Sequence, residues 1–263
     1  MAQVLIIGAG RAGSSLARAL RDVGCDVEGP VGRGYDLTTI AAAITTIVIA
    51  TSDDAISSVA AKIPSSERRL VVHLSGSLGV DALAPHPRRA SLHPLVPLPT
   101  TELGAQRLTS GITFAVAGDT QVQELVSVLR GKVLDVDDDD RVRYHAAACV
   151  AANHVVALMG HVERIAASAG LPLEAFLDLT RAAVDDVARF GPRNALTGPV
   201  SRGDWATLDR HVESLDPSER ASYRAGVGLA LELVATRDQL QQGDDPVEEL
   251  PEVRSASGAS LVG

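Results

Sequence analysis

A run of glycines near the N-terminus has the spacing of a phosphate-binding turn. Gly8, Gly10 and Gly13 follow the apolar run 4–7 and precede a helix-like segment. In such a strand-turn-helix unit the first glycine permits a tight bend, the second lets a pyrophosphate approach the backbone, and the third lets the helix pack closely on the strand. The N-terminus of the helix adds free N–H groups and a partial positive charge. The segment therefore predicts a dinucleotide-binding site.

The residue about 20 positions beyond the third glycine decides which dinucleotide is favoured. That residue is Arg33, which lies between Gly32 and Gly34. A carboxylate there would hydrogen-bond the ribose 2′-hydroxyl and repel a 2′-phosphate, whereas an arginine binds phosphate oxygens in pairs. The sequence therefore favours NADP(H), and Asp36 keeps NAD(H) as the alternative.

Polar side chains that follow other apolar runs are candidates for chemistry on the same ligand. Ligands of doubly wound sheets bind at the carboxyl ends of the strands. Ser75 and His93 are the best-placed polar side chains at such ends, and Thr51 and Ser52 should pass beside the nicotinamide half of a dinucleotide. For His93 the alternative is a histidine that only fixes the loop before Pro94.

The stretch 141–169 predicts a helix that is apolar on nearly every face, with a few polar interruptions. At ~100° per residue, His145 and Asn153 lie about 80° apart and could line one cleft. His154 and His161 stand ~10.5 Å apart along the axis, too far for a simple helical metal pair, so we expect no metal. Such a helix needs cover from a bundle or from a second copy of the chain, which indicates a homodimer.

The elements that must position these residues alternate between strand and helix up to about residue 136, and only helices follow. Short apolar runs bounded by turn residues predict strands near 4–7, 25–31, 47–50, 70–74, 90–92, 112–116 and 133–136. We therefore predict an α/β fold in which a doubly wound Rossmann domain over 1–140 precedes an all-α dimerisation domain over 141–240. The segment 241–263 has little apolar content and is predicted to be a disordered tail.

Composition narrows the class of protein. The net charge of −9 argues against a nucleic-acid partner, for which a basic face is expected. Two cysteines give no disulfide framework, and no uncharged apolar stretch reaches the ~20 residues that span a bilayer. The N-terminus has no basic region of an export signal, so we expect a cytoplasmic protein without a membrane partner.

Taken together, these motifs resemble bacterial Rossmann-like proteins with a C-terminal helical domain of unknown function, which are similar to ketopantoate reductases and to the 6-phosphogluconate-dehydrogenase-like reductases. The resemblance covers nearly everything before the tail, and its most specific part is the string 196–204. It is carried by residues 8–13, 47–56, 72–76, 91–94, 144–153 and 196–204. The resemblance implies an NADP-dependent oxidoreductase with a helical dimerisation domain and leaves the substrate open.

One departure from that family bears on the mechanism. Ketopantoate reductases use a lysine on the first long helix as general acid, whereas this chain has only Lys62 and Lys132, neither of them on that helix. The His-Pro pair is also similar to a loop of prephenate dehydrogenase, in which a histidine contacts the reacting hydroxyl and a serine supports it; His93 and Ser75 match those positions. A histidine near pH 7 is chemically suited to supply the proton.

The first hypothesis is therefore an enzyme that transfers hydride between NADP(H) and a small carboxylate-bearing carbonyl or imine, best a 2-oxo acid of the ketopantoate kind. A reductase similar to prephenate dehydrogenase, or one acting on a cyclic imine such as pyrroline carboxylate, is the alternative, and a non-catalytic NADP(H)-binding sensor is the second class. The expected site residues are catalytic His93, Ser75, His145 and Asn153, substrate-binding Arg202 and Thr197, and cofactor-binding Gly8, Gly10, Arg11, Ala12, Gly13, Arg33, Ala50, Thr51 and Ser52.

Overall fold

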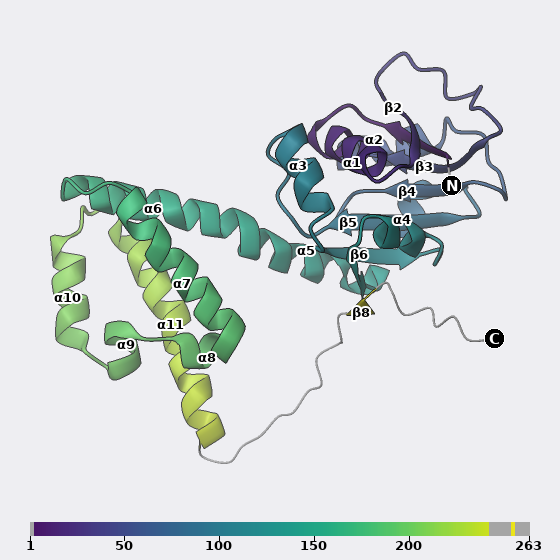
Figure 1. Ribbon diagram of the computed structural model, residues 1–263. Coiled ribbons are helices and arrows are strands. Elements are labelled where there is room, and N and C mark those ends of the chain that lie inside the picture. The colour runs from purple at the N-terminus through teal and green to yellow at the C-terminus, as the bar shows by residue number, and fades with distance from the viewer. Residues whose placement is uncertain (1–2, 242–253, 256–263) are drawn as a thin grey trace. The chain divides into compact units, whose positions relative to one another are not determined.

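The computed structural model describes residues 3–241 and 254–255, which form two compact units (Figure 1). The first unit runs to Ala152 and includes the two-residue strand β8 (Arg254–Ser255), and the second begins at Asn153. The observed boundary lies twelve residues beyond the predicted one, because the first helix after the sheet packs against the first unit. Apart from Gln241 and β8, the tail predicted over 241–263 lies outside the described residues.

The first unit is built on one mostly parallel sheet. Its strands are β1 (Gln3–Ile7), β2 (Asp26–Val31), β3 (Ile44–Ile49), β4 (Leu70–His73), β5 (Arg89–Pro94), β6 (Thr113–Gly118), β7 (Lys132–Asp135) and β8, in the order β2-β1-β3-β4-β5-β6-β7-β8. The first five strands of this order run parallel, while β6 pairs antiparallel with β5. The seven strands expected from sequence are all present. The predicted doubly wound α/β fold is confirmed.

The strand order places the ligand-binding edge. The chain leaves β1 in one direction to β2 and later returns to its other side as β3, so the order reverses between these two strands. Ligands of open α/β sheets bind in the crevice that this reversal opens at the carboxyl ends of the strands. The ends of β1 and β3 are in register, with Ile7 opposite Ile49, so the segments that follow them begin side by side.

Two apolar cores hold helices on the two faces of the sheet. One core packs α1 (Arg11–Asp22), α3 (Thr101–Leu108) and α4 (Val122–Val128) on alternate strand residues such as Val4 and Val48. The other packs α2 (Asp53–Ala60) and the short helix η1 (Val80–Leu83) on residues that include Leu5 and Ile47. Alternation along buried parallel strands produces both cores from one near-continuous apolar pattern.

The backbone is helical from residue 138 to 168. A short turn η2 (Asp138–Asp140) leads into α5 (Arg141–Cys149), the π-helical segment η3 (Val150–His154) and α6 (Val155–Ser168). A π-helix has a wider turn than an α-helix. The 80° angle expected between His145 and Asn153 assumed a regular α-helix, so that angle does not apply here.

The second unit is all helical in its described part. After α6 it contains α7 (Glu174–Phe190), α8 (Pro192–Ala195), α9 (Gly198–Arg202), α10 (Trp205–Ser214) and α11 (Arg220–Gln241). Within it, His161 of α6 bonds Glu219, the residue before α11, over 2.6 Å from Nδ1 to Oε2, and Arg164 bonds the same carboxylate. These contacts fix the start of α11 to α6.

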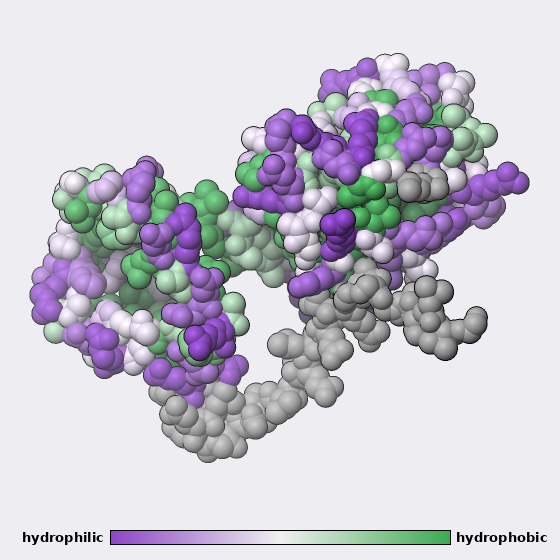
Figure 2. Space-filling view, viewed as in Figure 1, coloured by the Kyte–Doolittle hydropathy of each residue, from purple (hydrophilic) through white to green (hydrophobic). Residues whose placement is uncertain are grey.

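The helix over Asp138–Ser168 has the length and composition that a membrane span would need, although only 6% of its most apolar window is buried. A single such helix is weak evidence for a membrane, because helices covered by other protein pass the same test. Val150, Val156 and Leu158 are more than half exposed, and hydrophobic surface is visible along this helix in Figure 2. The sequence predicted cover for this helix, and the described part of the single chain does not provide it.

Candidate functional site

The glycine turn has the geometry of a phosphate cradle. A Cβ at Gly13 would lie 2.0 Å from the carbonyl oxygen of Gly8, so helix α1 approaches the strand as closely as the third glycine of such a turn requires. Gly8 has a φ of 113°, and a Cβ there would lie 2.5 Å from the carbonyl oxygen of Ala50. At Gly10 a Cβ would meet nothing within 4 Å, so the backbone there is open to a pyrophosphate.

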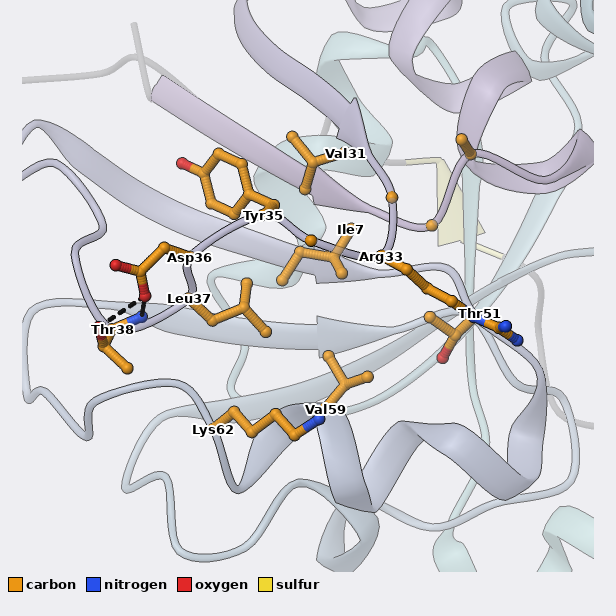
Figure 3. Close-up of a pocket in the computed structure, with 14 residues that line it drawn as sticks. Ile7, Val31, Arg33, Tyr35, Asp36, Leu37, Thr38, Thr51, Val59 and Lys62 are labelled. Atoms are coloured by element: carbon orange, nitrogen blue, oxygen red, sulfur yellow. Dashed lines mark hydrogen bonds between the residues drawn. The ribbon is translucent and has the colours of Figure 1, made fainter.

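A pocket of about 550 Å³ adjoins this turn (Figure 3). It is lined by the end of β1, the β2–β3 loop, Thr51 after β3, and Val59 and Lys62 from the end of α2. Arg33 and Thr51 are both among the residues that line it. Within the described residues the side chains of Arg33 and Lys62 are exposed and form no hydrogen bond or ion pair, so both cations are available to an anionic ligand.

Asp36, the residue that kept NAD(H) as an alternative, is occupied by its own loop. Its Oδ1 accepts hydrogen bonds from the backbone N of Thr38 at 2.9 Å and from the Thr38 hydroxyl at 2.6 Å, and its Oδ2 accepts one from Thr39. These bonds hold the pKa of Asp36 below its ordinary value. The carboxylate therefore shapes the loop and turns away from Arg33 in Figure 3. This arrangement supports a 2′-phosphate over a free 2′-hydroxyl in the pocket.

Ser75 lies at the same edge of the sheet and joins two loops. Its Oγ donates to Oδ2 of Asp53 at 2.7 Å and accepts from the backbone N of Ser77 and of Leu78. The Ser77 hydroxyl donates to the same Asp53 oxygen at 2.9 Å. None of the hydrogen-bond partners of Ser75 is His93, so the observed role of this buried hydroxyl is to tie the loop after β4 to the start of α2. Among the described residues no hydrogen bond joins Ser75 to His93, so the predicted support of His93 by Ser75 stays a prediction.

His93 meets two aromatic side chains of α5. Its Nδ1 lies 2.6 Å from the hydroxyl of Tyr144, and the ring of His145 stands edge-on to it with centroids 5.9 Å apart. Gly76 closes the cluster, because a Cβ there would lie 2.6 Å from Cδ2 of His145 and 3.0 Å from Nε2 of His93. Cys149, one helical turn beyond His145, has its Sγ 3.9 Å from Nε2 of that histidine. The structure thus brings His93 and His145 together, as the sequence had placed both in one site.

The surroundings of His93 keep its imidazole neutral at pH 7. Burial, and then the charges of His145 and Arg141, lower the pKa of His93 to about 4, and the charge of Asp53 opposes them. Burial raises the pKa of Tyr144 to about 12. A neutral imidazole cannot act as the cationic acid near pH 7 that the sequence suggested, although it can donate one N–H. This structure therefore assigns His93 a different chemical form from the one expected.

Three residues of this region were not singled out from sequence. Tyr144 and Arg141 lie on the face of α5 that meets the sheet, and Lys62 lines the pocket beside Arg33. The spacing of Arg141, Tyr144 and His145 is the i, i+3, i+4 pattern of one helix face, and that signal was present in the sequence. The sequence did not indicate which face of this helix would meet the sheet.

Asn153, Thr197 and Arg202 belong to the second unit. Asn153 lies in η3, Thr197 precedes α9 and Arg202 ends it, and all three are exposed within that unit. Their expected contacts with substrate stay predictions. Asp204, which follows, caps α10 by accepting a hydrogen bond from the backbone N of Thr207 at 3.1 Å.

Part of the chain matches the model of a known protein family. Residues 110–228 match the family model of a domain of unknown function, DUF2520. No curated protein matches the chain. The expected resemblance therefore has support from a domain model that covers under half of the chain and carries no assigned activity.

Solved structures match nearly the whole chain. Protein TM1727 from Thermotoga maritima is 22% identical, with a TM-score of 0.70, and the match covers 90% of this chain and 100% of that one. The "putative NADP oxidoreductase BF3122" from Bacteroides fragilis is 21% identical, with a TM-score of 0.71 and coverage of 88% and 98%. Pyrroline carboxylate reductase from Plasmodium falciparum, solved with NADP bound, is 14% identical, with a TM-score of 0.59 and coverage of 89% and 100%. At these identities the likeness establishes a shared fold, a Rossmann domain followed by a helical one.

Proposed function

We propose that this protein is an NADP-dependent oxidoreductase that acts on a small carboxylate-bearing carbonyl or imine. The observation that carries the proposal is the meeting of two features at one sheet edge. A glycine turn open at Gly10 adjoins a pocket with two unpaired cations, and a neutral histidine, His93, lies at the carboxyl end of a strand in the same parallel set. The NADP named for two of the structural neighbours agrees with this reading.

The residues of the first unit fit the dinucleotide part by part. Gly8, Gly10 and Gly13 shape the turn that receives the pyrophosphate, with the N-terminus of α1 behind it. No acidic residue stands in the first turn of α1 to repel a phosphate. Arg33, joined by Lys62, receives the 2′-phosphate, while Arg11, Ala12, Ala50, Thr51 and Ser52 border the path of the cofactor. When bound, the nicotinamide supplies or accepts the hydride.

His93 would act on the substrate oxygen or nitrogen as a hydrogen-bond donor. When the Tyr144 hydroxyl donates to Nδ1 over 2.6 Å, the proton of the neutral ring is left on Nε2. Both Cε1 and Nε2 of His93 lie beside Gly76, which packs against the ring too closely for a Cβ. A donor already aimed at the place where negative charge develops stabilises the transition state without reorganisation. His145, edge-on to His93, borders the same space.

A positive side chain in the second unit, Arg202, favours a substrate that carries a carboxylate. Arg202 and Thr197 are proposed to hold the substrate carboxylate, and Asn153 to complete the polar lining. A cyclic imine is the second candidate, because pyrroline carboxylate reductase and imine reductases, including one from Streptomyces aurantiacus, share this fold. A sensor that binds NADP(H) without catalysis would need no donor such as His93, and the built cluster around that ring favours an enzyme.

The apolar helix supports a homodimer. Two copies packed along α5 and α6 would cover the exposed Val150, Val156 and Leu158, which nothing in the described part of the single chain buries. A symmetric contact of this kind is the commonest way to cover such a face. Both cysteines are free thiols, which agrees with the cytoplasmic location we propose.

A substrate screen with the purified protein tests this function. Oxidation of NADPH is followed at 340 nm with a panel of 2-oxo acids and a panel of cyclic imines that carry a carboxylate. We expect turnover with members of one panel and a clear preference for NADPH over NADH. NADPH binding without turnover in either panel would favour the sensor, and no binding of either cofactor would refute the proposal.

A further inference from the structure

Arg141, the first residue of α5, is a fully buried cation with no hydrogen-bond partner among the described residues. Its exposed fraction is 0%, and none of its guanidinium nitrogens, Nε, Nη1 or Nη2, meets an acceptor. Its nearest carboxylate oxygen, Oδ1 of Asp138, lies 3.8 Å from Nε, and the other oxygen of that carboxylate accepts from the backbone N of Val80 at 2.9 Å. Buried charges in folded proteins are normally paired through hydrogen bonds. Among the described residues, Arg141 therefore has an ion pair with Asp138 at 3.8 Å but no hydrogen bond.

Arg141 shares its helix face with two residues that contact His93. Arg141, Tyr144 and His145 share one face of α5, as residues three and four apart do. Tyr144 bonds Nδ1 of His93, and His145 stands against the same ring. On the sheet side, His73 of β4 and Ser91 of β5 face each other in register and are fully buried. A buried charge in this cluster is screened far less than one in water.

We propose that Arg141 is a positioning residue: its buried charge, on the face of α5 whose Tyr144 and His145 contact His93, disfavours a second proton on that ring, and Arg141 itself touches neither substrate nor cofactor. The part of this statement that concerns the reaction rests on the proposed function. The part that concerns the charge state of His93 does not, because it can be measured in the protein alone.

The balance of charges around His93 supports the assignment. The groups that act on its imidazole are Asp53 from α2, His73 from β4, and Arg141 and His145 from α5, with the Tyr144 hydroxyl hydrogen-bonded to it. Among them Arg141 is the one permanent cation, and its charge lowers the pKa of both His93 and His73. Asp53 opposes it and accepts hydrogen bonds from two serine hydroxyls. Loss of the Arg141 charge should therefore let His93 accept a proton more readily.

The same helix offers a matched control. Arg143 lies two residues further on, its side chain is 83% exposed, and it pairs with Asp140. Replacing it removes the same formal charge from the same helix where water screens that charge. A general effect of net charge would appear equally in both variants.

The test follows His93 by NMR titration in protein labelled at its histidines, with the signal assigned by its loss in His93→Gln. In the unmutated protein and in Arg143→Met we expect His93 to stay neutral down to about pH 4. In Arg141→Met the pKa of His93 should rise, although burial still holds it below 6.5, and in Arg141→Lys, which keeps a cation, it should stay low. Thermal unfolding verifies that each variant is folded, and Arg141→Gln replaces Arg141→Met if the latter is not.

Turnover supplies the second readout. In Arg141→Met the acid side of the pH profile of kcat should move to higher pH together with the titration of His93, while the Kd for NADPH stays unchanged. An unaltered His93 titration in the folded neutral variants would overturn the role of Arg141 whatever the activity. Unchanged turnover in His93→Gln would instead overturn the proposed part of His93 in the reaction, and the titration alone would then decide whether Arg141 controls its charge.

Discussion

Gly76→Ala is the smallest change that should disturb the histidine pair. Gly76 has no positive φ, so an alanine fits the backbone and the added methyl is the only perturbation. That methyl would lie 2.6 Å from Cδ2 of His145 and 2.9 Å from Cε1 of His93. Ordinary van der Waals contact begins at 3.4 Å, so His145 must withdraw by about 0.8 Å and His93 by about 0.5 Å.

The size of the effect follows from this displacement. Overpacking of this kind costs about 1–3 kcal/mol of folding stability, and a donor displaced by a large part of 1 Å loses on the order of 10²-fold in rate. Binding of NADPH should change little, because Gly76 follows β4 and the phosphate turn follows β1. We therefore expect kcat to fall by about 10²-fold with a nearly unchanged Kd for NADPH.

Initial rates with the substrate accepted in the screen, and NADPH titration by fluorescence, measure the two quantities separately. Gly226→Ala is the matched control, because a Cβ there meets nothing within 4 Å and lies within α11. If Gly76→Ala turns over as fast as the control with unaltered unfolding, His93 and His145 do not form the reacting centre in the arrangement described.

Four further outcomes are expected. Arg33→Ala should weaken NADPH binding about tenfold or more and leave NADH binding unchanged, as measured by isothermal titration; an equal loss for both cofactors would contradict the 2′-phosphate contact. Tyr144→Phe removes the 2.6 Å bond to His93 and should lower kcat by about 10-fold or more at constant NADPH affinity, and retained turnover would show that the tautomer needs no such fixing. His73 and His93 each have a pKa lowered from 6.5 to about 4, so the unfolded chain binds protons at a higher pH than the folded protein does. Folding stability should therefore fall as the pH drops from 6.5 toward 4. Urea unfolding at pH 7 and pH 5 measures this loss of stability, which should be smaller in His93→Gln. Val156→Glu, at a position 73% exposed in the single chain, should convert a dimer to a monomer in light scattering, and an unmutated monomer at micromolar concentration would remove the dimer.

Features that depend on short stretches of chain were predictable from the sequence. The glycine turn and the strands follow from local steric demands and from apolar runs, and each is where it was expected. His93 was expected at the carboxyl end of a strand because ligands of parallel sheets bind there, and it is the residue before the last one of β5.

Features that depend on tertiary contacts were not predictable in the same way. Tyr144 and Arg141 become important only because Tyr144 of α5 meets His93 of β5 and Arg141 is buried, and both are tertiary features. The neutral state of His93 follows from that same burial, which spacing alone does not reveal. Ser75 has the expected location but bonds Asp53, because the loop after β4 turns its hydroxyl toward α2.

The sequence analysis also did not predict the π-helical segment η3 or strand β8. A π-turn is set by small differences in backbone pairing within an Ala-rich helix, and its residues have no distinctive composition. Strand β8 pairs antiparallel with β7 over two residues that come from the predicted tail. An edge strand of this length carries too little apolar pattern to stand out.

The affinity of the unmutated protein for NADPH and for NADH tests the central claim most directly. Titration of each cofactor into the purified protein at moderate ionic strength gives both dissociation constants without any knowledge of the substrate. The site formed by the glycine turn, Arg33 and Lys62 requires that NADPH bind at least about tenfold more tightly than NADH. Equal affinity would contradict the 2′-phosphate pocket, and absence of binding to either would contradict the cofactor site as a whole.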